Sequence, residues 1–282
     1  MEKEQLVEKL ILMLVKNLRS SVQNQVNDFA KDYQVQRALL RGLMNMHPVS
    51  QELPLEFFTY QDELLQLELK EKKLASFENF YQSSLNENVY LYEGDICAIK
   101  ADAIVNSANE TLLGCFQAGH NCTDNCIHSA SGLQLRFECA KLVRDLKVPI
   151  TPGTTIITHG FNLPNKYVIH TVAPKIFYDL KDDAKAELKL CYEHSLNIAR
   201  NNQVKTLAIS FVGSEQHGIP LVKCAKVATD VVYENLKEHH NDLKVVLLSE
   251  NERQTNALKT YFVHQDDNKN KDLHPFFNVD LM

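Results

Sequence analysis

The sequence predicts an α/β fold in which a mixed, mostly parallel sheet follows a helical N-terminal segment. From residue 88 onward, short apolar runs alternate with longer amphipathic stretches. Such alternation is typical of a parallel sheet with helices on both faces. Before about residue 80, leucines recur at helical spacing instead. We therefore expect a helical extension over 1–85, an α/β domain over 86–263 and a polar tail over 264–282.

The N-terminal segment is expected to form three helices. The first carries one apolar stripe, formed by Leu6, Leu10, Ile11, Leu14, Val15 and Leu18. The second covers Val22 to Leu43 with a break near Asp32, and the third covers Asp62 to Leu74 after two interrupting prolines. We expect the stripes to pack against the main domain, because no motif indicates a partner-binding role.

The α/β domain is expected to contain six strands and four helices. The strands are Val89–Tyr92, Ala103–Asn106, Thr154–Thr158, Lys166–Thr171, Thr206–Phe211 and Val245–Leu248. The helices are Asp124–Leu146, Asp182–Arg200, Leu221–Glu238 and Asn251–Tyr261. Binding sites in such folds lie at the carboxyl ends of the strands.

The composition excludes several classes of protein. The 282 residues are 44% hydrophobic and 23% charged, which is ordinary for a globular protein. A net charge of −6 argues against nucleic-acid binding, which needs a basic face. The apolar stretch near the N-terminus is too short and too acidic for a signal peptide or a membrane span. Seven cysteines in such a chain indicate free thiols, and we expect a cytoplasmic monomer.

Three potential metal ligands lie within eight residues of one loop. Cys115, His120 and Cys122 form the pattern C-x4-H-x-C between a predicted strand and a predicted helix. This spacing is too tight for a zinc finger, which needs two ligand pairs on separate elements. Three protein ligands without an obvious fourth are typical of a catalytic zinc with one open position. The alternative is two small buried cysteines and a polar loop histidine; the other five cysteines fit that interpretation.

The residues around this loop resemble the macrodomain signature. The matching segments are 106–109 (NSAN) after a strand, 124–128 (DNCIH) and 129–132 (SASG). In that family this region wraps ADP-ribose, and the resemblance, over roughly residues 88–262, implies a three-layer α/β/α sandwich. The inserted segments 114–116 and 120–122 resemble the zinc-dependent branch, which is similar to protein-ADP-ribose hydrolases. Ala118 stands where that branch usually has proline, so a less rigid loop is expected.

The resemblance assigns the two ends of the ligand to different residues. Asp95 and the amide of Ile96 match positions that recognise adenine, although an Asp after Gly94 is also a common turn residue. Asn109 matches the position nearest the distal ribose. Asn106 is counted among the ligand-binding residues, although its expected role is structural support.

Asp124 is the residue expected to act in catalysis together with Asn109. It matches a carboxylate placed near the distal ribose, where it could orient or deprotonate water. Its alternative part is an N-terminal helix cap, and both can hold together. His128 is expected to be a structural histidine with satisfied hydrogen bonds. His170 resembles a strand-end residue of the family and is also expected to be structural.

A second loop, residues 212–220, resembles the family's phosphate loop. In such a loop, backbone amides and a helix N-terminus hold the pyrophosphate without a Lys or Arg. Glu215 replaces the family's central glycine, and we expect its carboxylate to weaken binding. The ligand-binding residues expected here are Gly213, Ser214, Glu215, Gln216, His217 and Gly218.

The function implied by the resemblance is zinc-dependent removal of mono-ADP-ribose from modified protein side chains. The expected cofactor is Zn²⁺, and the expected partners are ADP-ribose and a mono-ADP-ribosylated protein. Two alternatives stay open: a non-catalytic ADP-ribose-binding module, and a deacetylase of O-acetyl-ADP-ribose.

Overall fold

The computed structural model describes residues 1–16, 32–213, 220–240 and 242–263. Within them, a seven-stranded sheet has the order β1-β2-β7-β6-β3-β5-β4. The five central strands are parallel, whereas β1 and β4 pair antiparallel at the two edges. The strands are β1 Tyr81–Gln82, β2 Val89–Glu93, β3 Ala103–Ala108, β4 Thr155–His159, β5 Tyr167–Val172, β6 Thr206–Ser210 and β7 Lys244–Ser249.

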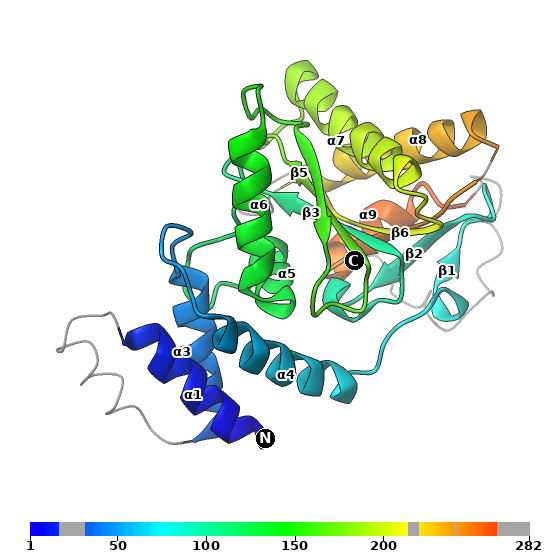
Figure 1. The fold of residues 1–282 in the computed structure, drawn as a ribbon. Helices are drawn as coiled ribbons and strands as arrows, with labels where there is room; N and C mark the ends of the chain where they lie inside the picture. The colour runs from blue at the N-terminus through cyan, green and yellow to red at the C-terminus, as the bar shows by residue number, and fades with distance from the viewer. Residues whose placement is uncertain (17–31, 214–219, 241, 264–282) are drawn as a thin grey trace.

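Helices cover both faces of this sheet (Figure 1). One face packs on α5 and α6 through Ile104, Ile127 and Leu135, and the other packs on α7, α8 and α9 through Val105 and Leu196 among others. The helices are α5 Thr123–Ser131, α6 Leu133–Asp145, α7 Asp182–Asn201, α8 Leu221–Glu238 and α9 Glu252–Lys259. The expected three-layer α/β/α sandwich is therefore confirmed.

The expected strands lie where the apolar runs placed them, and the sequence missed only the two-residue edge strand β1 among the described strands. One expected helix was wrong. Asp124–Leu146 is two helices, because Gly132 adopts φ 98° and ψ 172° between α5 and α6. That backbone conformation is essentially restricted to glycine. A Cβ at Gly132 would also collide with the Gln61 side chain.

The N-terminal extension consists of α1 (Lys3–Val15), α3 (Tyr33–Met46) and α4 (Leu55–Glu71), which pack around their own apolar cluster. The expected stripe of α1 is buried over its described residues. Asp32 caps α3 by accepting hydrogen bonds from two amides, while the expected helical residues 22–31 lie outside the described residues. Helix α4 begins directly after Pro54, earlier than expected, because proline is compatible with a helix start.

Two residues of α6 join the extension to the sandwich. Leu133 belongs to the apolar cluster of the extension, and Phe137 packs against it. Figure 1 shows α3 and α4 lying against the end of the sandwich that carries α5 and α6. None of the helices in the described part of the chain is long and apolar enough to cross a membrane.

Replacing Gly132 tests the break between α5 and α6. We expect Gly132→Ala to lower the free energy of unfolding by about 2 kcal/mol, because its backbone conformation strains any residue with a Cβ. Gly42→Ala is the matched control, since an added Cβ there would lie 3.5 Å from the Ala118 Cβ, an ordinary contact. Urea denaturation measures both; equal stability of Gly132→Ala and wild type would contradict the assignment.

Candidate functional site

The candidate site lies at the carboxyl edge of the parallel strands. Asp95 follows β2, the metal-ligand loop (residues 113–122) follows β3, and Gly213 follows β6. Because parallel strands end at one edge, these three loops meet there. The topology thus brings together segments that are more than a hundred residues apart in sequence.

The Asp124 carboxylate is at the centre of this edge. Its side chain is 5% exposed. It accepts hydrogen bonds from Asn106 Nδ2 at 2.7 Å and from Asn109 Nδ2 at 3.2 Å. Burial raises the pKa of Asp124 to about 6, although the Asn106 hydrogen bond and the charge of Arg136 act in the opposite direction. Two side-chain amides, one in β3 and one directly after it, therefore hold the buried carboxyl group in a fixed orientation.

Asp124 is not the helix cap that the sequence suggested. Cys122 is the N-cap of α5, and its Sγ accepts a hydrogen bond from the Asn125 amide at 3.4 Å. The last of the three potential metal ligands therefore also starts the helix that carries Asp124. The position of Asp124 in the first turn of α5 additionally suits its negative charge.

Asn106 lies behind Asp124. It is fully buried, and its Nδ2 also lies 3.1 Å from His170 Nδ1 on the neighbouring strand β5. His170 Nε2 lies 2.9 Å from Thr158 Oγ1, whose hydroxyl donates to the Val168 carbonyl. This chain of contacts requires His170 Nδ1 to be an acceptor and Nε2 a donor. Burial accordingly lowers the pKa of His170 to about 3, so a neutral histidine orients Asn106.

His128 differs from the satisfied structural histidine that was expected. It is 5% exposed, and neither ring nitrogen has a hydrogen-bond partner among the described residues. Its Nε2 lies 3.5 Å from Asp124 Oδ1. Burial lowers the pKa of His128 well below its ordinary value, with smaller effects from His170 and Arg136. A neutral ring therefore packs against the carboxyl group instead of forming an ion pair with it.

Asn109 connects Asp124 to the metal-ligand loop. Its Nδ2 donates to the Gly114 carbonyl at 3.1 Å as well as to Asp124, and its Oδ1 accepts from the Thr111 amide at 2.9 Å. The residue is half-buried, unlike Asn106. One amide therefore fixes the start of the loop and the carboxyl group relative to each other.

The structure brings the three predicted ligands together. The ligand atoms of Cys115, His120 and Cys122 lie within 4.8 Å of one another, and all three residues are half-buried. Cys115 Sγ lies 3.6 Å from His120 Nδ1. Tetrahedral zinc with bonds of about 2.3 Å to sulfur and about 2.05 Å to nitrogen would place these atoms about 3.6 Å apart. The donor set therefore fits zinc.

The sequence did not reveal a second cluster, formed by His128, Cys139 and His170. Their ligand atoms also lie within 4.8 Å of one another, but all three residues are buried. The two nitrogens of His170 already contact Asn106 and Thr158. Burial also raises the pKa of the Cys139 thiol far above its ordinary value. This cluster is therefore less suited to a metal than the loop.

Asp95 contacts the N-terminal extension. One carboxylate oxygen accepts a hydrogen bond from the Cys97 amide at 2.8 Å, and the other pairs with Lys72 Nζ at 2.9 Å. Lys72 is the C-cap residue directly after α4, and Ile96, the residue after Asp95, is buried. The carboxylate expected to bind adenine is thus shared with a lysine of the extension.

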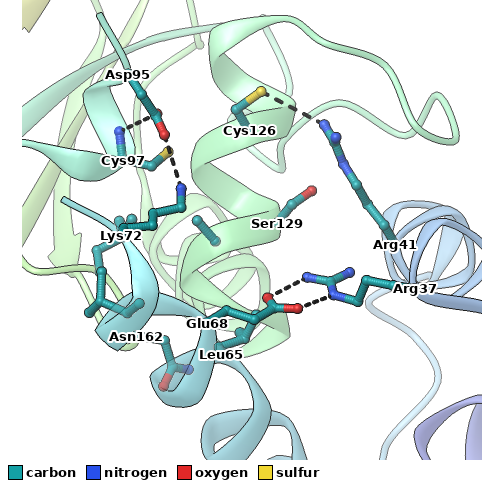
Figure 2. A pocket seen from close by; sticks show the side chains of 13 residues that line it. Arg37, Arg41, Leu65, Glu68, Lys72, Asp95, Cys97, Cys126, Ser129 and Asn162 are labelled. Atoms are coloured by element: carbon teal, nitrogen blue, oxygen red, sulfur yellow. Dashed lines mark hydrogen bonds and ion pairs between the residues drawn. The ribbon is translucent and has the colours of Figure 1, made fainter. Parts of the chain in front are cut away.

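A pocket of about 270 Å³ lies between α3, α4 and α5 (Figure 2). Figure 2 shows Arg37 directed at Glu68, Lys72 at Asp95 and Arg41 at Cys126. The pocket therefore lies between the extension and the sandwich. In its wall, Arg37 and Lys72 form ion pairs, and Arg41 contacts a thiol.

The described residues include only Val212, Gly213 and Pro220 of the second loop. Gly213 has φ 122°, and its amide lies 3.4 Å from Ser107 Oγ on β3. Glycine suits this left-handed backbone. The other expected positions, from Ser214 to Gly218 and including Glu215, lie outside the described residues.

Comparison with known proteins identifies the family. The Macro domain family pattern matches residues 105–228. A protein named protein-ADP-ribose hydrolase from Treponema medium is 36% identical over 217 residues, covering 76% of this chain and 83% of the relative. A protein of the same name from Staphylococcus aureus is 36% identical over 74% of this chain and 77% of the relative. This chain belongs to the macrodomain family.

Solved macrodomain structures agree with this membership. The Oceanobacillus iheyensis macrodomain with ADP is 26% identical, with a TM-score of 0.55 over 64% of this chain and 93% of that one. The Trypanosoma brucei macrodomain in complex with ADP-ribose is 22% identical, with a TM-score of 0.59 over 75% and 92%. The latter likeness shows a shared fold. The expected resemblance to macrodomains is confirmed, and the curated relatives over most of the chain are named as hydrolases.

The metal-ligand loop of this macrodomain predicts about one bound zinc ion per chain. We expect Cys122→Ser to lose the metal but keep its fold, because serine is a weak zinc ligand and a good N-cap for α5. Cys126→Ala is the matched control, since this half-buried thiol on α5 lies outside the ligand set. Elemental analysis of the three purified proteins measures zinc; full zinc content in Cys122→Ser would exclude Cys122 as a ligand.

The buried histidines predict how stability depends on pH. A histidine with a lowered folded pKa stays neutral in the fold, so below about pH 6.5 the unfolded chain binds the proton and stability falls. His170→Gln removes this effect. Its destabilisation relative to wild type should therefore shrink by about 1.4 kcal/mol per pH unit as pH falls from about 6 to 4. Urea denaturation across this range measures it, and a pH-independent difference would contradict the neutral buried ring.

Proposed function

We propose that this macrodomain is a zinc-dependent hydrolase that removes mono-ADP-ribose from modified protein side chains. The observation that carries the proposal is the link made by Asn109, which joins the metal-ligand loop to the buried carboxyl group of Asp124. A candidate metal site and a candidate catalytic carboxyl group thus share one edge of the sheet. The names of the relatives support the same reaction.

Cys115, His120 and Cys122 would hold the zinc ion and leave one position open. When bound, zinc supplies a Lewis acid that can polarise a ribose hydroxyl or a water, tempered by two thiolate ligands. The protein supplies the rigidity of this loop, because Asn109 binds the Gly114 carbonyl at its start and Cys122 caps α5 at its end.

Asp124 would orient the attacking water and accept its proton. The two asparagine amides hold the carboxyl group toward the end of β3, which keeps it from rotating away. Asn109 is half-buried and so can also offer its amide to a ribose hydroxyl. Asn106 is a positioning residue, because it is fully buried behind Asp124.

ADP-ribose would extend from this centre along the carboxyl edge of the sheet. Asp95 and the amide of Ile96 would bind adenine, and the segment from Gly213 to Gly218 would hold the pyrophosphate through backbone amides. An amide cradle reconciles an anionic ligand with a net charge of −6. Glu215 would lie in that cradle and is expected to weaken binding.

The proposal predicts that Asp124→Asn slows hydrolysis by about 10²-fold or more while ADP-ribose affinity stays within about threefold of wild type. Asparagine preserves the size of the side chain but cannot accept the proton. Release of ADP-ribose from a mono-ADP-ribosylated protein measures turnover, and calorimetry measures affinity.

The competing functions give different results in the same assays. A pure binding module would bind ADP-ribose but release none from the modified protein. A deacetylase would act on O-acetyl-ADP-ribose and leave the modified protein intact. Either pattern in the zinc-loaded wild type would reject the proposed reaction.

A further inference from the structure

Helix α3 of the N-terminal extension contacts the metal-ligand loop at a tight turn. Residues 117–120 form a turn closed by the His120 amide and the Gln117 carbonyl at 3.2 Å, with Gly119 at φ 65°. The Gly119 amide donates to Asn45 Oδ1 at 3.0 Å, although 74 residues separate the two. Asn45 is 2% exposed, and its Nδ2 donates to Ser129 Oγ on α5 at 3.0 Å. One buried side chain therefore fixes the turn to α5.

Arg41, one helical turn before Asn45, holds the next part of the loop. Its Nη2 donates to the carbonyl of His120, a predicted metal ligand, at 2.8 Å. The same nitrogen donates to Asn125 Oδ1 at 2.9 Å, and Asn125 Nδ2 donates to the Gln117 carbonyl at 3.0 Å. The turn between the first two ligands is thus held from both sides.

Arg136 of α6 ties the end of α3 to the beginning of the loop. Its Nη1 donates to the carbonyls at the carboxyl end of α3, and its Nε donates to the Leu113 carbonyl at 2.9 Å. The ring of Phe116, next to the ligand Cys115, lies 4.2 Å from the guanidinium carbon. Arg136 therefore fixes the position of the loop relative to α3.

These contacts concern the loop that carries the proposed zinc. We infer that α3 is a working part of the metal site: Asn45 and Arg41 are positioning residues that hold Cys115, His120 and Cys122 in ligating geometry. This inference rests on the proposed function only in taking zinc as the metal. Its physical basis is preorganisation, because a loop that is already ordered loses less conformational entropy when the metal binds.

Ala118 makes this support more important in this chain. Alanine leaves the backbone at the second position of the 117–120 turn freer than proline would. Gly42 of α3 faces that residue, since a Cβ added at Gly42 would lie 3.5 Å from Ala118 Cβ. Hydrogen bonds from α3 therefore restrain a turn whose own residues leave its backbone free.

The test compares zinc affinity in Asn45→Ala and Arg41→Gln with that of wild type, by competition with a chromogenic chelator in the full chain. Loss of an outer partner of a metal ligand typically weakens binding by 10- to 100-fold, so we expect zinc dissociation constants raised by about that factor. Circular dichroism establishes that each variant is folded. If Asn45→Ala does not fold, Arg41→Gln alone decides.

Leu236→Ala is the control for a purely structural effect. Leu236 of α8 is fully buried in the apolar cluster on the other face of the sheet, so its truncation should lower the unfolding temperature of the metal-free protein. We expect its zinc affinity to stay within about twofold of wild type, because effects at sites without shared partners are independent. Wild-type zinc affinity in the folded Asn45 and Arg41 variants would overturn the inference. Wild type that takes up no zinc would instead reject the proposed metal.

Discussion

The site depends on the cost of burying the Asp124 carboxyl group. A carboxylate taken out of water needs partners, and here two amide donors and a nearby cation supply them. Both donors come from the end of β3, which lies between β5 and β6 in the parallel sheet. His170 opposite Asn106 in the register of β3 and β5 completes the support. A shift of one residue in this register would turn Asn106 away from Asp124.

The metal-ligand loop, in contrast to the buried Asp124, is held in place mainly by residues outside its own sequence. Residues 116–119 are exposed, and Gly119 adopts left-handed backbone. Its order comes from partners outside it: Asn109 at its start, α5 at its end, and Asn45 and Arg41 from α3. An apparently separate extension and the loop are thereby parts of one arrangement. The apolar surface of α1 and α4 secures α3 in its place.

Local patterns predicted much of this molecule, whereas long-range contacts could not be read from them. Strand runs and the C-x4-H-x-C spacing depend on neighbours in sequence, so the sheet and the clustering of Cys115, His120 and Cys122 followed from them. The contact of Lys72 with Asp95, and that of Asn45 with Gly119, depend on tertiary packing. The break at Gly132 was missed because glycine can also occur inside helices. Cys122 was missed as a cap because cysteine is not among the preferred N-cap residues.

Arg136 has a consequence for how the molecule comes apart. Its guanidinium is buried, and it serves carbonyls of α3 and of the ligand loop while its backbone belongs to α6. If the extension dissociated from the sandwich, the Arg136 guanidinium would lose its hydrogen bonds to carbonyls of the extension. Leaving a buried cation without these partners costs free energy. Dissociation of the extension and unfolding of the sandwich are thereby coupled. The chain should behave as a single cooperative unit, in which the extension has no independent folding equilibrium of its own.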